Sequence, residues 1–297
     1  MSTSILLEGR SLLKVSDLSA SEVAGVLDTA VALKDERSTK LAGQTLGLIF
    51  IQQSTRTRIS FSAAMTQLGG TPLSLRGDEL QLSRGESIGD TARVLSRYVE
   101  AVAIRTLSHS DLEEFAENAS IPVINALTEI EHPCQALADA LTIRDRLGTL
   151  DGVRIGWVGD GTNVLVSLAE IAKLTGASVV AACPEGYDPP AATPLELVRD
   201  PREAAEGADV LVTDIWVSLG QEAEAEKRLR DLEPYRLDQD LVDRAGDEAI
   251  VLHCLPAHPG EEIAADVLYG GQSAVWDEAE NRLHVQKALL ALMLGVA

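Results

Sequence analysis

Short apolar runs alternate along the chain with longer amphipathic stretches. These runs predict buried strands at residues 46–51, 72–75, 101–104, 122–125, 153–158, 178–182, 210–213, 249–252 and 273–275. Helices are predicted at residues 19–31, 54–68, 88–98, 111–118, 132–147, 202–206, 222–232 and 277–294, and one more opens after the turn at 159–163. Alternation of strand and helix is typical of parallel sheets with right-handed crossovers.

Length and residue type sharpen this prediction. The chain has 297 residues, more than one compact core usually holds, so two domains are expected. Apolar residues make up 45% and aromatic residues only 3%, which favours α/β layers packed with aliphatic side chains. We therefore predict an α/β fold of two doubly wound parallel-sheet domains joined by interdomain helices. The first is expected at residues 1–147, with a C-terminal helix at 278–297 packed back on it, and the second at 148–277.

The charge of the chain is strongly negative. A formal net charge of −21 results from 46 acidic and 25 basic residues, and only six of the basic residues are lysines. This balance argues against nucleic acid and anionic membranes as partners. We interpret the acidic excess as an adaptation to high salt, which screens repulsion between surface charges.

The cysteines and the N-terminal segment bear on whether the protein is disulfide-rich, metal-binding, secreted or membrane-bound. Cys134, Cys183 and Cys254 show no C-x-x-C spacing, and histidines are not clustered, which argues against a disulfide framework or a metal site. Residues 1–10 are polar and mixed, and no long apolar run occurs in the chain. We expect a cytoplasmic protein.

The pentapeptide Ser54-Thr55-Arg56-Thr57-Arg58 follows the first predicted strand and opens the next helix. The first N–H groups of a helix lack partners inside it, and the helix dipole favours negative charge at that end. Hydroxyl groups add donors, and the planar guanidinium of Arg56 can bind two phosphate oxygens at once. The segment predicts a phosphate site, with a capped helix and solvated arginines as the alternative.

Three further polar motifs each follow a predicted strand or open a predicted helix. They are H-P-C-Q at 132–135, D-x-W-x-S-x-G at 214–220 and H-C-L-P at 253–256. Ligands of open α/β sheets bind beyond the carboxyl ends of the strands, where these motifs are expected. Together with S-T-R-T-R, and in this order, the motifs resemble the aspartate/ornithine carbamoyltransferase family, and within it the ornithine branch. The resemblance extends from about Leu12 to the C-terminal helix.

The resemblance implies that the first domain binds carbamoyl phosphate. The implied contacts are Ser54, Thr55, Arg56, Thr57, Gln81, Arg105, His132, Pro133, Cys134, Gln135, Cys254, Leu255 and Arg282. Arg56, Arg105, His132 and Cys254 are the implied catalytic residues. In the family Gln81 often reaches a neighbouring subunit, so a homotrimer or a multiple of trimers is expected. Gln52 stands where the family commonly has lysine, which predicts a weaker grip on phosphate or help from Arg58 or potassium.

The second domain is implied to bind L-ornithine through Asn163, Asp214, Ser218 and Leu219. A carboxylate suits the α-ammonium group of an amino acid, and Leu219 replaces the methionine usual in the family. The implied reaction is attack of the δ-amine on the carbamoyl carbon, which gives citrulline and phosphate. It needs no metal or cofactor, and it favours closure of the domains around both substrates.

Several alternatives remain open. The same first substrate could react with putrescine, an acylated ornithine or a carrier-linked ornithine, and biosynthetic and catabolic use share one site. A non-catalytic paralogue is a further alternative. The G-x-G at 159–161 would fit a nicotinamide-dependent oxidoreductase, but Val164 stands where that fingerprint requires its third glycine. The alternating charges at 222–232 predict a solvated helix face, and the segment 184–194 is too short for a usual crossover helix.

Overall fold

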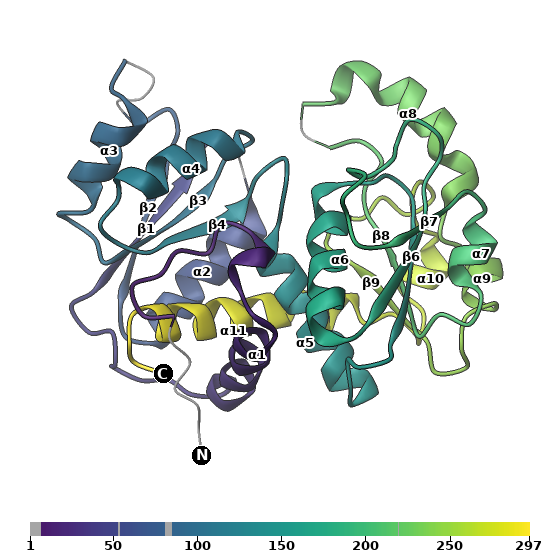
Figure 1. Ribbon diagram of the computed structural model, residues 1–297, viewed down its shortest axis with the longest axis horizontal. Coiled ribbons are helices and arrows are strands. Elements are labelled where there is room, and N and C mark those ends of the chain that lie inside the picture. The colour runs from purple at the N-terminus through teal and green to yellow at the C-terminus, as the bar shows by residue number, and fades with distance from the viewer. Residues whose placement is uncertain (1–6, 53, 81–84, 219) are drawn as a thin grey trace. The chain divides into compact units, whose positions relative to one another are not determined.

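The computed structural model describes residues 7–52, 54–80, 85–218 and 220–297, which form two compact units (Figure 1). Unit 1 comprises Met1–Leu137 with Arg282–Ala297, and unit 2 comprises Ala138–Asn281. Helices α5 (Pro133–Leu147) and α11 (Val275–Met293) each contain residues of both units. The domain limits at residues 147 and 278 remain predictions.

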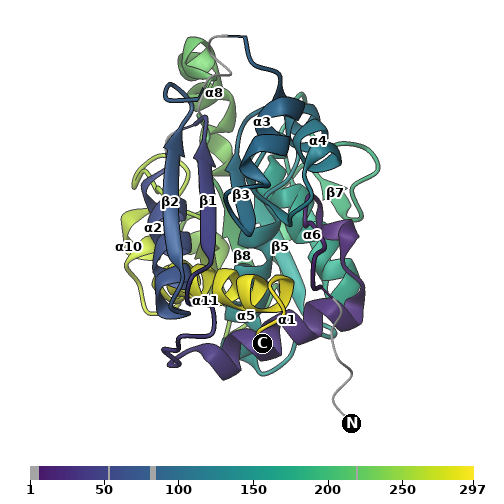
Figure 2. The same ribbon diagram turned by 90° about the vertical axis from the view of Figure 1, so that its left-hand side faces the viewer.

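Unit 1 is built on a four-stranded parallel sheet in the order β2-β1-β3-β4. Its strands are β1 (Thr45–Phe50), β2 (Thr71–Arg76), β3 (Ala101–Arg105) and β4 (Val123–Leu127). Figure 2 shows β2, β1 and β3 side by side. All four apolar runs predicted in this part of the chain are therefore strands, and the parallel pairing expected from the alternating pattern is confirmed.

Helices cover both faces of this sheet. They are α1 (Ala20–Leu33), α2 (Thr55–Gln67), α3 (Ile88–Leu95) and α4 (His109–Asn118), with a short 3-10 turn η1 (Val15–Asp17) before them. Val102 and Ile104 of β3 pack with Leu112 and Phe115 of α4, on the face that α3 and α4 cover in Figure 1. A capping box begins α1, since the side chains of Ser19 and Glu22 each accept a hydrogen bond from the other's backbone N–H group.

Unit 2 contains a five-stranded parallel sheet in the order β7-β6-β5-β8-β9. Its strands are β5 (Arg154–Val158), β6 (Ser178–Ala182), β7 (Glu196–Val198), β8 (Val210–Thr213) and β9 (Ile250–His253). The edge strand β7 was not predicted, because only three residues pair and two of them are exposed. The strand predicted at 273–275 is wrong: Ser273 forms an isolated bridge with Val251, and α11 already begins at Val275.

Side chains alternate between two cores along the strands of unit 2. The helices of this unit are α6 (Asn163–Thr175), α7 (Pro201–Ala205), α8 (Ala225–Leu232), α9 (Gln239–Val242) and α10 (Ala265–Leu268), with 3-10 turns η3 (Glu222–Glu224) and η4 (Glu233–Tyr235). Trp157 of β5 packs on the side of α6, whereas Val158 packs on the opposite side with residues of α7, α9 and α10. Two buried faces explain the nearly continuous apolar runs, and the doubly wound α/β class is confirmed. Among the described residues, no helix is long and apolar enough to cross a membrane.

Candidate active site

The order of the strands identifies where each unit would bind a ligand. In unit 1 the chain proceeds from β1 outward to β2 and then returns to the other side of β1 to form β3. In unit 2 it proceeds from β5 to β6 and β7, then returns to form β8 beside β5. Ligands of open α/β sheets bind at the carboxyl ends of the strands next to such a reversal. In unit 1, Ser54 follows β1 and Arg105 is the last residue of β3. In unit 2, Asn163 follows β5 and Asp214 follows β8.

The first half-site is formed by the N-terminus of α2 in unit 1. Ser54 is the N-cap of this helix, and its hydroxyl accepts a hydrogen bond from the N–H of Thr57 at 3.3 Å. Thr55 and Arg56, in the first turn, are exposed, while Thr57 is fully buried. Because the first turn of a helix offers unpaired N–H groups and a positive dipole end, this part of β1–α2 suits an anion.

Two cations and one imidazole converge on this helix end. The buried Arg282 of α11 donates from Nη2 to the Thr57 hydroxyl at 2.6 Å, although 225 residues separate them in the chain. Arg105 is the last residue of β3, at the carboxyl end of the strand next to β1. Burial holds the pKa of His132 well below 6.5, and the charges of Arg282 and Arg105 lower it further. His132 is therefore a neutral imidazole close to two guanidinium groups.

The residues after His132 are buried in the first turn of α5. Pro133, Cys134 and Gln135 all lie inside unit 1. Burial raises the pKa of the Cys134 thiol to about 12, and the thiol donates to the backbone oxygen of Asn125 at 3.5 Å. The Cys134 side chain thus packs against β4 as a neutral thiol.

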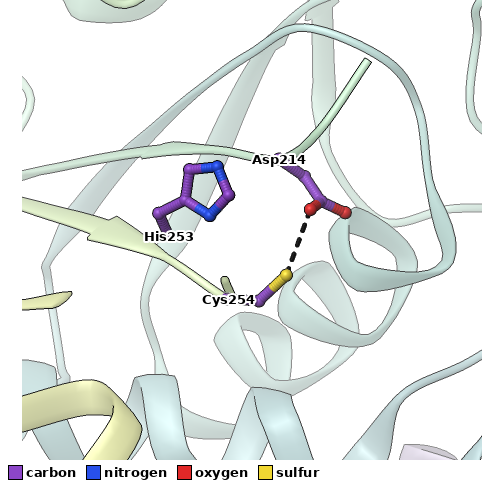
Figure 3. A group of neighbouring side chains, drawn as sticks. All are labelled: Asp214, His253 and Cys254. Atoms are coloured by element: carbon purple, nitrogen blue, oxygen red, sulfur yellow. Dashed lines mark hydrogen bonds between the residues drawn. The ribbon is translucent and has the colours of Figure 1, made fainter. Parts of the chain in front are cut away.

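The second half-site, in unit 2, is centred on Asp214 at the carboxyl end of β8 (Figure 3). Its side chain is nearly buried, with 6% of the residue exposed. Oδ1 accepts from the Cys254 thiol at 3.1 Å and from the N–H of Ile215 at 2.8 Å, while Oδ2 accepts from the Thr162 hydroxyl at 3.3 Å. Three strand ends, those of β5, β8 and β9, therefore meet at one carboxylate.

Asn163 and Ser218 occupy the loops on either side of Asp214. Asn163 is the first residue of α6, and the N-cap Thr162 makes no side-chain bond to that helix because its hydroxyl points to Asp214. Ser218 is half-buried, and its N–H donates to the side-chain oxygen of Gln221 at 2.9 Å. A Cβ on Gly161 would come within 2.3 Å of the Pro189 nitrogen, so close chain packing explains this glycine without a dinucleotide.

His253 braces the H-C-L-P loop. Its Nδ1 accepts from the N–H of Leu255 at 3.0 Å, which leaves the proton on Nε2, and Nε2 then donates to Glu262 at 3.1 Å. Both side chains are fully buried. The loop needs this support because Leu255 has a φ of +57°, a conformation that side chains other than glycine rarely adopt.

Two groups of side chains among the described residues have the spacing of metal ligands. In the group Asp214, His253 and Cys254, both ring nitrogens of His253 are already hydrogen-bonded, which argues against metal binding. In the group His258, Glu261 and Glu262, one Glu262 oxygen already accepts from His253 and from the N–H of His258. The hydrogen bonds of Glu262 thus support the turn at 258–262.

The structure thus gathers most of the predicted residues at two places. Thr57, Arg105, His132 and Arg282 lie at the end of α2 in unit 1; Cys254, predicted as a contact of the same ligand, lies beside Asp214 in unit 2. Gln81 and Leu219 lie outside the described residues. The sequence reasoning missed the support residues Thr162, Glu262 and Arg228. For Thr162, the signal would have been its place as a helix N-cap in a site loop.

Comparison with known proteins agrees with both half-sites. Residues 10–145 match the carbamoyl-P binding domain of aspartate/ornithine carbamoyltransferase, and residues 151–293 match its Asp/Orn binding domain. The ornithine carbamoyltransferase of a Synechococcus species is 51% identical over 97% of this chain and 99% of its own, and that of Pyrococcus abyssi is 48% identical over 98% of both.

Solved structures give the same result. The ornithine carbamoyltransferase from Pyrococcus furiosus superposes with a TM-score of 0.95 at 47% identity, covering 99% of both chains. The enzyme from Thermus thermophilus gives a TM-score of 0.90 at 41% identity, over 95% of this chain and 98% of the other. The two domain matches together span nearly the whole chain, and the resemblance seen in its motifs is confirmed. The chain belongs to the aspartate/ornithine carbamoyltransferase family.

Proposed function

We propose that this chain transfers the carbamoyl group of carbamoyl phosphate to the δ-amine of L-ornithine, which gives L-citrulline and phosphate. The observation that carries the proposal is the cluster at the N-terminus of α2. Arg282 donates to the Thr57 hydroxyl there, and the charges of Arg282 and Arg105 act on the neutral His132. Relatives named ornithine carbamoyltransferase, 48–51% identical over nearly the full chain, support the choice of both substrates.

The phosphate group of the first substrate needs donors and positive charge. In the proposal the N–H groups of the first turn of α2, the hydroxyls of Ser54 and Thr55, and Arg56 bind its oxygens. The same contacts stabilise phosphate as it leaves with the electron pair of the bond that breaks. Because the global charge of −21 would repel a dianion, local cations at this helix end are required.

The carbamoyl oxygen gains negative charge when the amine adds to the carbamoyl carbon. Arg105 and His132 are the proposed donors to this oxygen. A neutral imidazole can donate a hydrogen bond but gives up its proton far less readily than an imidazolium would. His132 is therefore proposed to stabilise the tetrahedral species electrostatically, while Gln135 orients the carbamoyl amide group.

Unit 2 is proposed to select the amine. Asp214 would pair with the α-ammonium of ornithine, and Asn163 and Ser218 would hydrogen-bond its α-carboxylate and α-amino groups. Cys254, already bonded to Asp214, is proposed to lie beside the side-chain amine and position it for attack. The amine must be neutral to attack, and the proton that it loses on forming the new C–N bond leaves with the phosphate or with water.

The proposal also covers the location, the working conditions and the assembly of the enzyme. We propose that the enzyme is cytoplasmic, works in high salt and assembles as a homotrimer or a multiple of trimers. The excess of 46 acidic over 25 basic residues supports activity in high salt. The contact of Gln81 with a neighbouring subunit, implied by the family resemblance, is the basis of the proposed assembly.

The direct test is stoichiometry. Purified protein in molar KCl is given carbamoyl phosphate and L-ornithine, and citrulline and phosphate are both quantified against a no-enzyme control. Equal amounts of the two products above background are expected, and the Arg105→Gln variant should produce neither at a comparable rate. Release of phosphate without citrulline would show hydrolysis instead of transfer, and would contradict the proposal.

A further inference from the structure

Arg228 is buried in α8, a helix whose other charged side chains are exposed or half-buried. The sequence of α8 is largely charged, and the alternating charges at 222–232 predicted a solvated helix face. Arg230 lies on such a face, with 74% of its side chain exposed, but Arg228 does not, because only 6% of it is exposed. A buried arginine is costly unless its donors are used, so its partners are informative.

The guanidinium of Arg228 bonds two different loops. Its Nε donates to the backbone oxygen of Trp216 at 2.6 Å, in the loop that follows β8. Its Nη2 is paired with the carboxylate of Asp160, in the turn that follows β5. The group also lies 5.1 Å from the centre of the Tyr187 ring, which suits a cation over an aromatic face.

These two loops flank the reversal of the sheet in unit 2 and carry the proposed ornithine contacts. The loop after β8 contains Asp214 and Ser218, and the turn after β5 leads to Asn163. Asp160 and Asp214 are close enough that the charge of Asp214 raises the pKa of Asp160, which burial raises most, while Arg228 opposes both effects. Without Arg228, Asp160 would be a second, uncompensated acid beside Asp214.

We propose that Arg228 is a positioning residue that fixes both loops of the amine half-site and neutralises Asp160, so that Asp214 is the carboxylate left to bind the α-ammonium of the second substrate. This inference rests on the proposed function. Arg228 acts through Asp160 and Trp216 and needs no contact with substrate. Lysine cannot replace it fully, because one ammonium group cannot reproduce the planar fork that bonds both loops.

The test compares Arg228→Gln and Arg228→Lys with the matched control Arg230→Gln, which removes an exposed charge from the same helix. For each protein, KM for ornithine, KM for carbamoyl phosphate and kcat are measured in molar KCl, and thermal melting checks the fold. We expect Arg228→Gln to raise KM for ornithine at least about tenfold, the scale of a lost charge-assisted hydrogen bond, with KM for carbamoyl phosphate unchanged. Arg228→Lys should show a smaller rise in the same constant, and Arg230→Gln none.

The outcomes separate this role from simple stabilisation. A role in folding alone would lower kcat through the folded fraction and leave both KM values as in the wild type, which would overturn the inference. Equal rises in both KM values would also overturn it. If Arg228→Gln does not fold, Asp160→Asn decides. It keeps an acceptor for Arg228 but leaves the guanidinium charge uncompensated near Asp214, so KM for ornithine should rise; a KM equal to that of the wild type would exclude the charge argument.

Failure of the proposed function gives a different result. A wild-type protein that does not carbamoylate ornithine refutes that function before any variant is compared. The variants are then assayed with the amine that the wild type accepts. A raised KM for that amine, with KM for carbamoyl phosphate unchanged, is the result that the role of Arg228 predicts.

Discussion

At the scale of single residues, His132 shows how burial sets chemistry. The pKa of this imidazole is held well below 6.5 in the native state, while in the unfolded chain it returns to about 6.5. Below pH 6.5 the unfolded chain therefore binds a proton that the native protein does not. The stability contributed by neutral His132 is complete above pH 6.5 and is lost as the pH falls below it.

This sign gives a measurable prediction. On unfolding in guanidinium chloride at pH 5.5, wild-type protein should take up more protons than His132→Asn. The excess has an upper limit of about 0.9 proton, because about nine tenths of unfolded histidine is charged at this pH. Uptake is measured with a pH-stat. At pH 8.5 the two proteins should differ little, which serves as the control. Equal uptake at pH 5.5 would show that His132 is already protonated in the native state.

The three cysteines should differ in reactivity. Burial raises the pKa of Cys134 and of Cys183 to about 12, whereas Cys254 is half-buried beside Asp214. Iodoacetamide at pH 8 is expected to label Cys254 first in the native protein, and the others only after unfolding; peptide mass spectrometry measures the order. Labelling of all three at one rate would contradict the burial of the other two.

Substitution of the same thiol tests its role in the reaction. Cys254→Ser should raise KM for ornithine and lower kcat, because the hydroxyl places the amine less well, while binding of carbamoyl phosphate is retained. Steady-state kinetics and calorimetric titration with carbamoyl phosphate measure the two effects. Kinetics equal to those of the wild type would mean that Cys254 only packs at the end of β9.

The role of a residue was predictable where a local sequence motif reveals it, and was not predictable where it depends on partners far away in the chain. The S-T-R-T-R motif indicated the anion site because it stands at a helix start that the sequence itself reveals. The contact of Arg282 with Thr57 spans 225 residues, and the sequence did not predict it; only the family resemblance implied a role for Arg282. Arg228 was missed because it stands among other charged residues in the sequence. Only the fold shows that its guanidinium group bonds Asp160 and the backbone oxygen of Trp216.

At the scale of elements, the N-cap of α2 is proposed to serve both stability and binding. Replacing an N-cap serine by alanine typically costs about 1 kcal/mol of stability. We expect this loss from both Ser54→Ala in α2 and Ser19→Ala in α1, but only Ser54→Ala should also raise KM for carbamoyl phosphate. Urea denaturation and kinetics distinguish the two effects. An equal change of KM in both variants would contradict the placement of the anion at α2.

Predictions of elements succeeded where burial is strong on both faces. Strands β6 and β8 occupy the predicted residues because both are buried runs bounded by loops. Prediction failed for weak elements. Strand β7 was missed because its side chains are largely exposed, and residues 273–275 form only an isolated bridge before α11 begins. Hydrophobic pattern reports burial, and tertiary pairing decides whether a short buried run becomes a strand.

At the scale of the whole molecule, the acidic charge should make stability depend on salt. With a net charge of −21, repulsion between surface carboxylates opposes folding, and molar KCl screens it over short distances. The melting temperature at pH 7.5 should therefore rise from low salt to molar KCl. Near pH 5, close to the sequence pI of about 4.6, the gain should be smaller. No gain at pH 7.5 would refute the high-salt interpretation.

The central claim is that unit 1 binds carbamoyl phosphate and unit 2 selects a free α-amino acid as its acceptor. The most direct measurement offers L-ornithine, putrescine and N-acetylornithine separately to the enzyme with carbamoyl phosphate, and compares kcat/KM for each amine. Ornithine should be strongly preferred, because putrescine lacks the α-carboxylate and acetylation removes the α-charge that Asp214 would bind. Equal or better turnover of either other amine would contradict the assignment of Asp214, Asn163 and Ser218.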